Sequence, residues 1–436
     1  MRYYQRMTVL KNPLPRADLL ISGAAEIATP LGSEALAGLS LDKCQIRSGW
    51  AVATAGERIL AVGPAEDLRR EFSPALEYDA KGGTIVPGFV DAHTHPVFAG
   101  TREEEFELRT KGATYVEISL AGGGILSTVK GVRQESKEVL LIQLLRRMDR
   151  FLELGTTTVE AKSGYGLSTD DELKMLGVIA EANRMHPVDL VPTFLGAHEF
   201  PEEYRDRRED YVDLLVKEML PRIAEEGLAE YCDIFTEAHV FGLEDSRRIL
   251  MQAKTLGFRL RLHVDQLTSL GGAELAAEFG ADSADHLECV TDKGIEALGE
   301  AGVIPVLCPL VALYLRQKQE VPGRRMIDAG LAPAIATDFN PGSCFTQSMP
   351  EVMTWSALRM NMTAGEVLTA GTLNAAASLN RAKDIGSLEC GKRADLLILD
   401  VPNHRHLAYE LGRNPVRTVV KNGKVVHERK DFQFQG

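Results

Sequence analysis

The segment Thr84-Ile-Val-Pro-Gly-Phe-Val-Asp-Ala-His93-Thr-His95-Pro96 decides the fold prediction, because it leads from a buried strand to two histidines. Residues 85–90 are short, apolar and preceded by two glycines, which is typical of a buried strand that ends at a sheet edge. Alternate residues of a strand share a face, so we expect His93 and His95 to point the same way and to bind one metal ion. A His-x-His pair alone is often an accident, and its meaning depends on further ligands elsewhere in the chain.

Both ends of the chain have the composition of a small β-rich unit. Residues 17–22, 45–53 and 58–63 are strand-like runs separated by Gly, Asp and Glu. Residues 391–400 and 416–426 have the same texture, and Asn422-Gly423 is a strong signal for a two-residue hairpin. We expect residues 1–84 and 388–436 to combine into one composite β-sandwich domain.

Strand-like runs alternate with helical patterns between these ends. The predicted strands cover residues 85–90, 156–161, 189–196, 232–237, 259–264, 281–286, 303–308 and 332–338. Helical patterns lie between them, such as residues 137–154, 245–256 and 169–185, the last opened by the capping box Thr169-x-x-Glu172. This alternation predicts an α/β fold, a (β/α)8 TIM-like barrel over residues 85–387, in which functional residues gather at the carboxyl ends of the strands.

Composition narrows the function classes. With 436 residues, 44% hydrophobic and 25% charged, the chain is typical of a globular protein with one large and one smaller domain. A net charge of −13 argues against a nucleic-acid surface. The apolar runs are too short for a membrane span, and Met-Arg-Tyr-Tyr-Gln-Arg at the start lacks the apolar core of a signal peptide. The six scattered cysteines suit reduced thiols, so we expect a cytoplasmic protein that binds no membrane.

Chemically competent side chains stand at the ends of three further predicted strands. His263 and Gln266 end the fifth, His286 ends the sixth and Asp338 ends the eighth. Three imidazoles and one carboxylate form a good site for a divalent or ferric ion with a position left open for water. We therefore predict His93, His95, His263 and Asp338 as metal ligands, with Asp338 also as the proton shuttle and His286 as the group that polarises a carbonyl or holds the water.

Each of these residues also has a plainer interpretation. A single histidine at a strand end is more often a core or rim residue, and Asp338 alone could cap the following loop. Taken together, that interpretation requires five unrelated residues to reach one rim by chance, which disfavours it.

The chain also resembles the amidohydrolase superfamily, in the His-x-His strand end, the later His and Asp residues and the segment Gly386-Ser-Leu-Glu-Cys-Gly-Lys-Arg-Ala-Asp-Leu-Leu-Ile-Leu-Asp400. More narrowly, it is similar to the imidazolonepropionase family of histidine degradation over nearly its whole length. The motifs that carry this narrower resemblance are His93-Thr-His-Pro-Val-Phe-Ala-Gly-Thr-Arg102, Gly112-Ala-Thr-Tyr115, Ala121-Gly-Gly-Gly-Ile125, Lys162-Ser-Gly-Tyr-Gly166, Gly196-Ala-His198 and Asp338-Phe-Asn-Pro-Gly-Ser343.

The resemblance implies hydrolysis of the ring amide of 4-imidazolone-5-propanoate to N-formimidoyl-L-glutamate, with one Zn²⁺ or Fe³⁺ per subunit and a homodimer as the assembly. It also implies a set of substrate-binding residues: Arg102, Tyr115, Tyr165, His198, Gln266, Asn340, Gly342 and Ser343. Arg102 suits the propionate tail, because its planar fork takes a carboxylate in a bidentate pair. The plainer interpretations are a surface salt bridge for Arg102, packing for Tyr165 and, for His198, a rim histidine bonded to Glu199.

One departure from the family that the chain resembles concerns residue 266. Some members of the family carry Glu three residues after the fifth-strand His, where this chain has Gln266, which cannot accept a proton. The base role therefore moves to Asp338, together with His286. Lys162 and Glu160 lie two residues apart on one face, and we interpret them as an ion pair in the barrel mouth beside a mononuclear site.

Two other functions stay open from the sequence. One is a related amidohydrolase that acts on another cyclic amide or amidine, such as a heterocycle deaminase; a neutral base would leave Arg102 unpaired, which argues against it. The other is a metal-free barrel kept as an assembly protein, which the presence of every predicted ligand disfavours.

Overall fold

The computed structural model describes residues 14–114, 117–118 and 122–429. Its central sheet has eight parallel strands in the order β15-β14-β13-β12-β11-β10-β9-β8, so each strand pairs with its neighbour in sequence. The strands are β8 (Phe89–Asp91), β9 (Thr156–Lys162), β10 (Asp189–Ala197), β11 (Tyr231–Thr236), β12 (Arg259–Val264), β13 (Ser283–His286), β14 (Ile304–Leu307) and β15 (Ala334–Ile335).

The sheet closes into a barrel just beyond its first and last strands. An isolated parallel bridge joins Thr94 to Phe339, and the N–H of His95 donates to the Phe339 carbonyl oxygen over 2.9 Å. The N–H of Asp338 donates to the His93 carbonyl oxygen over 3.1 Å. Three of the four predicted metal ligands, His93, His95 and Asp338, therefore lie on the two segments that close the barrel, and this closure confirms the predicted TIM-like fold.

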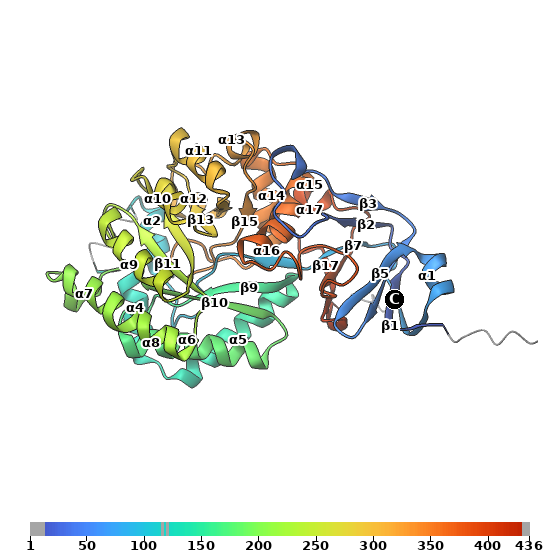
Figure 1. The fold of residues 1–436 in the computed structure, drawn as a ribbon, viewed down its shortest axis with the longest axis horizontal. Helices are drawn as coiled ribbons and strands as arrows, with labels where there is room; N and C mark the ends of the chain where they lie inside the picture. The colour runs from blue at the N-terminus through green and yellow to red at the C-terminus, as the bar shows by residue number, and fades with distance from the viewer. Residues whose placement is uncertain (1–13, 115–116, 119–121, 430–436) are drawn as a thin grey trace, which may run out of the picture.

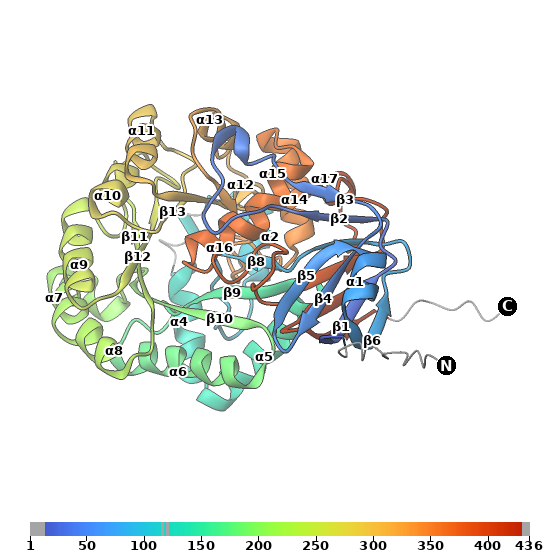
Figure 2. The ribbon, with the colours of Figure 1, turned by 45° about the vertical axis from the view of Figure 1, so that its right-hand side comes forward.

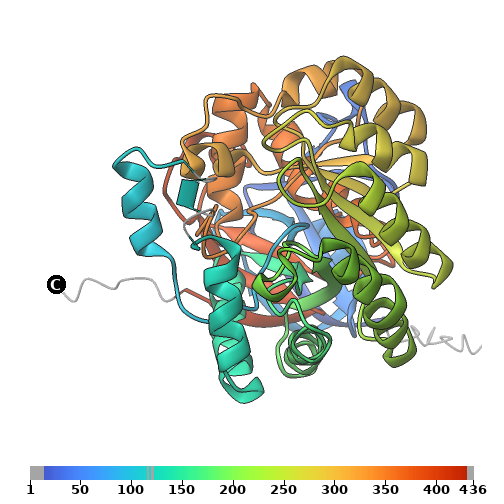
Figure 3. The ribbon, with the colours of Figure 1, turned by 90° about the vertical axis from the view of Figure 1, so that its left-hand side faces the viewer.

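Helices cover the outside of the barrel, as Figure 3 shows by a ring coloured from teal to orange. They include α4 (Ile125–Gln134), α5 (Lys137–Glu153), α6 (Thr169–Met185), α7 (Arg208–Leu214), α8 (Leu220–Glu226), α9 (Leu243–Thr255), α10 (Gly272–Phe279), α11 (Asp292–Ala301), α13 (Gly323–Asp328), α14 (Met349–Met360), α15 (Ala364–Thr369) and α16 (Ala375–Ser378). Two others, α2 (Glu103–Thr110) and α12 (Pro309–Leu315), follow β8 and β14. In α5 the buried residues Leu140, Leu144 and Met148 recur every four positions, so one stripe of the helix packs on the strands.

Two further sheets lie beside the barrel in Figures 1 and 2, one built from the N-terminal part of the chain alone and one from both chain ends. The four-stranded sheet contains β5 (Arg58–Pro64), β4 (Trp50–Ala55), β1 (Arg16–Ser22) and β6 (Ser73–Asp79). The six-stranded sheet contains β18 (Lys424–Glu428), β17 (Val416–Lys421), β16 (Leu396–Leu399), β7 (Thr84–Pro87), β2 (Glu26–Thr29) and β3 (Gln45–Arg47). Helices α1 (Ala65–Glu71) and α17 (His406–Tyr409) complete these segments.

The six-stranded sheet lies between two cores. Along β16, Leu397 and Leu399 belong to the core of the barrel, whereas Leu396 and Ile398 pack with residues of the four-stranded sheet such as Leu19. This alternation follows from the opposite directions of successive side chains in a strand. The predicted β-sandwich of the two chain ends is thus confirmed. One face of the six-stranded sheet packs on the four-stranded sheet, and the other face packs on the barrel.

The predicted single strand over residues 85–90 is wrong in one respect, because Gly88 divides it. β7 joins the six-stranded sheet, where it pairs with β16 and β2, and β8 starts the barrel. A Cβ atom at residue 88 would lie 2.4 Å from Thr157 Oγ1, so the crossing between the two sheets needs a glycine. Residues 45–53 are likewise divided, into β3 and β4 of different sheets, and in residues 332–338 only β15 is strand.

The predicted capping box of α6 is also wrong. The cap is Ser168, whose hydroxyl accepts the N–H of Asp171 over 3.2 Å. The buried carboxylate of Glu172 turns instead to the loop before the helix, where it accepts the N–H groups of residues 164, 166 and 167. The N–H groups of this loop are buried and require an acceptor from the protein, whereas the N–H groups at the start of the helix are close to solvent and can bond water. The first turn of α6 therefore holds the loop that carries Tyr165.

Two predictions of a general kind can be compared with the structure. Among the described residues, no helix combines the length and the apolar character that a membrane crossing requires. All six cysteines are free thiols, in agreement with their scattered positions in the sequence.

Candidate metal centre and active site

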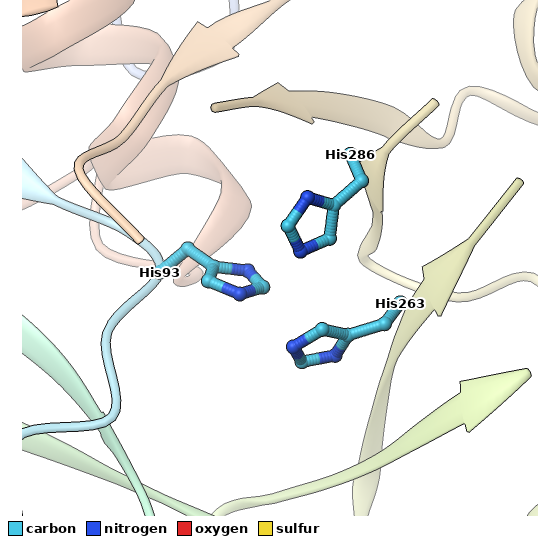
Figure 4. Close-up of side chains that lie close together, drawn as sticks. All are labelled: His93, His263 and His286. Carbon is cyan, nitrogen blue, oxygen red and sulfur yellow. The ribbon is translucent and has the colours of Figure 1, made fainter. Parts of the chain in front are cut away.

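Five side chains with metal-binding or acid-base chemistry meet at the carboxyl ends of the barrel strands. His93 and His95 follow β8, His263 lies on β12, His286 ends β13 and Asp338 follows β15. The ligand atoms of His93, His263 and His286 lie within 4.8 Å of one another, as do those of His93, His95 and Asp338. Figure 4 shows the first group, in which imidazoles approach one another from three segments. The structure brings together all five residues that the sequence places at strand ends.

Two carboxylates orient two of these imidazoles. Asp285 Oδ2 lies 2.6 Å from His93 Nδ1, and Asp233 Oδ1 lies 3.0 Å from His263 Nδ1. An ionised carboxylate only accepts, so each Nδ1–H donates and each Nε2 keeps its lone pair for another partner. The Nε2 atom of His263 lies 3.3 Å from the Nε2 atom of His95. The lone pair of His263 Nε2 therefore faces a ring nitrogen of His95, and one cation between the two nitrogens could bind both.

Buried ring nitrogens of the cluster lack hydrogen-bond partners. His93 Nε2, His95 Nδ1 and His286 Nδ1 make no hydrogen bond within the part of the chain that the structure describes. A buried polar atom without a partner costs about 1–3 kcal/mol. Asp338 Oδ1 lies 3.4 Å from the Nε2 atoms of both His93 and His95, so a carboxylate oxygen completes the donor set. Imidazoles and a carboxylate in this arrangement fit zinc or iron.

The electrostatics of the cluster also favour a bound cation. Burial acts to lower the pKa of His93, but the contacts and charges of Asp285 and Asp338 outweigh it and raise the pKa to about 9, so these carboxylates stabilise a positive charge here, carried by a proton or by a metal ion in its place. Burial lowers the pKa of His95 and His263, which keeps both imidazoles in the neutral form that binds a metal. Burial opposes the charge of Asp338, yet its contacts with His93 and His95 hold the pKa of that carboxyl well below its usual range.

Three residues of the site have a left-handed backbone, which is uncommon for side chains larger than glycine. The φ angles are 79° at His286, 70° at Leu287 and 51° at Asp338. Such conformations cost free energy and persist where the surrounding structure imposes them, often at functional sites. His286 and Asp338 both belong to the cluster, so the uncommon backbone conformations coincide with the site.

A layer of buried charges lies directly below the histidines. Lys162 Nζ lies 2.9 Å from Glu160 Oε1, which agrees with the predicted ion pair, and 2.8 Å from Asp233 Oδ2. All three side chains are fully buried. Arg261 Nη2 lies 3.1 Å from Asp285 Oδ2. Asp233 and Asp285 in this layer orient His263 and His93, so the buried charges support the metal cluster.

Sequence reasoning assigned no role to Asp233, Asp285 or Arg261. A signal was available, because each is a charged residue inside a strand that is otherwise buried. The strand pattern alone does not show which charges on different strands meet inside a barrel.

Arg102 has the environment of a ligand-binding residue. Its side chain is buried, and its Nε and Nη1 atoms make no hydrogen bond within the described residues. The nearest carboxylate contact, Glu105 Oε2, is 3.7 Å from Nε. The salt bridge considered for Arg102 is thus present as a long ion pair with Glu105, but the arginine is buried and does not lie at the surface. A Cβ atom at Gly342 would lie 1.0 Å from Arg102 Nη2, so glycine at that position makes room for the guanidinium.

Other predicted substrate residues line the same cavity as Arg102, namely Tyr165, His198, Gln266, Asn340 and Ser343. His198 Nδ1 donates to the Gly164 carbonyl oxygen over 2.9 Å, not to Glu199, and its ring stacks on that of His95 at 5.0 Å. Burial lowers the pKa of His198 well below its usual value, so the ring is neutral and its Nε2 is an acceptor. Tyr165 lies against His198, with 5.2 Å between the ring centroids.

The loop over residues 340–343 differs from the sequence expectation. The N–H groups of Gly342 and Ser343 donate to Asn340 Oδ1 over 2.7 Å each, so they are not directed at a ligand. Asn340 Nδ2 donates to Ser343 Oγ over 2.7 Å, and Ser343 Oγ lies 3.2 Å from Asp338 Oδ2. The loop thus orients Asp338. Tyr115, also predicted to bind substrate, lies outside the described residues.

Comparisons with known proteins agree with this geometry. The profile of the amidohydrolase family matches residues 84–426, and that of the imidazolonepropionase-like composite domain of bacteria matches residues 51–72. Among solved structures, an adenosine deaminase from Xanthomonas campestris with bound zinc superposes with a TM-score of 0.69 and 22% identity, covering 95% of this chain and 93% of that one. The Escherichia coli guanine deaminase gives 0.70 and 17%, covering 94% and 99%. At these identities the structures establish the fold alone.

Curated relatives are much closer in sequence. The imidazolonepropionase of Symbiobacterium thermophilum is 48% identical over 413 residues, which are 94% of this chain and 97% of the relative. That of Solibacter usitatus is 52% identical over 372 residues, or 85% and 89%. That of Clostridium tetani is 42% identical over 418 residues, or 95% and 100%. Because the amidohydrolase profile matches most of the chain and these relatives align with 85–95% of it, the chain belongs to the imidazolonepropionases of the amidohydrolase family.

Proposed function

We propose that this chain hydrolyses the ring amide of 4-imidazolone-5-propanoate to N-formimidoyl-L-glutamate in L-histidine degradation. The observation that carries this proposal is the buried Arg102 guanidinium, whose Nε and Nη1 make no hydrogen bond among the described residues and which lines one cavity with His95 and Asp338 of the metal cluster. A cation in that place suits a substrate with a carboxylate tail next to the reacting ring. The names of the relatives support the same substrate.

One metal ion per subunit, zinc or iron, would be held by His93, His95, His263 and Asp338. When bound, such an ion polarises the ring carbonyl and lowers the pKa of a water molecule. Below the histidines, Asp233 and Asp285 keep His263 and His93 in the tautomer that leaves Nε2 free for this purpose.

Asp338 is the proposed proton shuttle. Its two oxygens have different surroundings: Oδ1 faces His93 and His95, whereas Oδ2 accepts from Ser343 Oγ at the cavity wall. We assign proton transfer to Oδ2. It takes a proton from the attacking water as the oxygen bonds to the ring carbonyl carbon, and it delivers that proton to the ring nitrogen as the C–N bond breaks.

The other cavity residues have roles in binding and orientation. His286 polarises the carbonyl or holds the water, and Gln266 hydrogen-bonds the ring but accepts no proton. Arg102 binds the propionate with its planar fork, in the space that Gly342 leaves. Tyr165 and His198 contact the ring. Tyr115 and the loop of Asn340 and Ser343 complete the proposed substrate site.

A spectrophotometric assay of freshly prepared 4-imidazolone-5-propanoate tests the proposal, with the product identified by mass spectrometry. We expect N-formimidoyl-L-glutamate and no released ammonia. Ammonia from a neutral heterocycle, with no turnover of the imidazolone, would favour the deaminase alternative. Purified, folded protein that contains neither zinc nor iron and keeps its activity in chelator would refute the metal-dependent mechanism.

We further propose a homodimer in the cytoplasm, with no membrane or nucleic-acid partner. Symmetric dimers are the commonest assemblies of such enzymes. Light scattering on the purified chain is expected to give twice the 47.7 kDa mass of one subunit. A mass of one subunit at micromolar concentration would refute the dimer.

A further inference from the structure

Lys162 stands out among the buried charges that the proposed mechanism leaves unused. Its side chain is fully buried at the end of β9, and its Nζ contacts Glu160 Oε1 at 2.9 Å and Asp233 Oδ2 at 2.8 Å. Asp285 is more distant, at 4.0 Å. A buried ammonium is costly without ion pairs, so this position is maintained by its carboxylate partners.

The two carboxylates that orient histidines are held in different ways. Asp285 has its own cation, Arg261 Nη2 at 3.1 Å, and accepts the hydroxyl of Ser283 over 2.5 Å. Asp233 accepts the N–H of Ile234 over 2.7 Å through the same Oδ1 that contacts His263. Its other oxygen, Oδ2, makes no hydrogen bond among the described residues and has Lys162 Nζ as its ion-pair partner at 2.8 Å.

We propose that Lys162 is a positioning residue of the metal site, which acts through Asp233 to hold His263 in the orientation that directs its Nε2 at the metal. The chain of contacts is Lys162 Nζ to Asp233 Oδ2, then Asp233 Oδ1 to His263 Nδ1 at 3.0 Å. The inference rests on the metal site of the proposed function and not on the proposed substrate.

Positioning and simple charge repulsion predict opposite results when the ammonium is removed. Lys162 is a cation near a site for another cation, so repulsion alone predicts tighter metal binding in its absence. If Lys162 positions Asp233, its removal frees the carboxylate to turn, and metal binding weakens. Loss of an outer partner of a metal ligand typically costs about 10–100-fold in affinity.

The test is the affinity for Zn²⁺, measured by chelator competition on the full chain, with folding checked by circular dichroism. We expect Lys162→Met, which keeps an unbranched side chain, to bind Zn²⁺ at least about tenfold more weakly than the wild type. Lys421→Met is the matched control. Lys421 is also buried and bridges two carboxylates, Asp189 and Asp395, at 2.6 Å each, but it lies in the six-stranded sheet. Its variant is expected to bind Zn²⁺ like the wild type.

A double-mutant cycle identifies the route through Asp233 and remains informative if Lys162→Met fails to fold. Compared with the wild type, the double variant Lys162→Met/Asp233→Asn lacks one charge of each sign, so the net charge of the barrel interior is unchanged. Because Lys162 acts through Asp233, adding Lys162→Met to the Asp233→Asn variant is expected to alter the Zn²⁺ affinity by less than about twofold.

Several results would overturn the inference. They are wild-type affinity in Lys162→Met, tighter binding in that variant, or a further tenfold loss in the Asp233→Asn background. Absence of Zn²⁺ binding by the wild type would refute the metal site itself, and with it the proposed function. A wild type that binds Zn²⁺ but does not turn over the imidazolone would refute only the substrate assignment.

Discussion

Asp338 combines two tasks in one side chain, because Oδ1 faces the histidines and Oδ2 faces Ser343 and the cavity. We expect Asp338→Asn to lower kcat by about 10³-fold or more, since an amide cannot take the proton. Circular dichroism is expected to show an unchanged fold. Ser343→Ala is the control, since it removes only the hydroxyl next to Oδ2 and should cost much less. Wild-type turnover in Asp338→Asn would refute the shuttle.

Arg102 and Gly342 form a contact pair that yields a second prediction. Arg102→Ala removes a charge-assisted hydrogen bond, so kcat/KM is expected to fall about 10–100-fold, mainly through KM. Gly342→Ala should act in the same direction, because its Cβ would lie 1.0 Å from Arg102 Nη2 and displace the guanidinium. Gly242→Ala is a matched control, since a Cβ there meets none of the described atoms within 4 Å. Unchanged KM in both site variants would place the carboxylate elsewhere.

At the scale of residues, the sequence predicted the five clustered side chains but not the buried charged residues that orient them. His93, His95, His263, His286 and Asp338 were found because barrel strands present their last residues at one rim. The contacts of Asp233 and Lys162 depend on strand tilt and stagger, which decide the interior positions that meet. No local pattern encodes these quantities.

The start of α6 shows a limit of prediction for single elements. Ser168 and Thr169 are both good capping residues, and only the observed backbone identifies Ser168 as the cap. We expect Ser168→Ala to lower the free energy of unfolding by about 1 kcal/mol, and Thr169→Ala by much less. Urea denaturation of the two variants measures the difference. Equal losses would contradict the assignment of the cap.

Strand β2 carries a pH-sensitive contact far from the metal centre. Burial acts to raise the pKa of Glu26, but the hydrogen bonds from His404 outweigh it and lower the pKa below its ordinary value of 4.5. A lowered carboxyl pKa contributes stability that is complete above 4.5 and is lost as the pH falls through the folded-state pKa. Relative to Glu26→Gln, the wild type should therefore be more stable at neutral pH and lose this advantage in acid. A pH-independent difference in melting temperature would refute the linkage.

At the scale of the whole molecule, metal binding should be coupled to folding. The ligands come from β12 and from the segments that follow β8 and β15, so the unfolded chain has no preformed site. A ligand at about 1,000 times its Kd stabilises the native state by about 4 kcal/mol. We expect removal of the metal by a chelator to lower Tm and restoration of zinc to reverse the loss, as calorimetry would show. A Tm independent of metal would contradict the coupling.

The order of strands in the barrel was predictable, because strands alternate with helices along the chain and such units build parallel sheets. The departure of β7 into another sheet was not, since residues 85–90 form one apolar run and the division at Gly88 depends on contact with Thr157. The division of the chain into residues 1–84 with 388–436, and 85–387, stays a proposal.

The place of β7 has a consequence for the synthesis of the chain on the ribosome. β7 pairs on one edge with β2, which precedes it, and on the other with β16, which is made about 300 residues later. Contacts of such long range form late and leave an apolar edge accessible meanwhile. A nascent chain released before β16 is made therefore exposes one edge of β7, and we expect chaperones to bind such a chain.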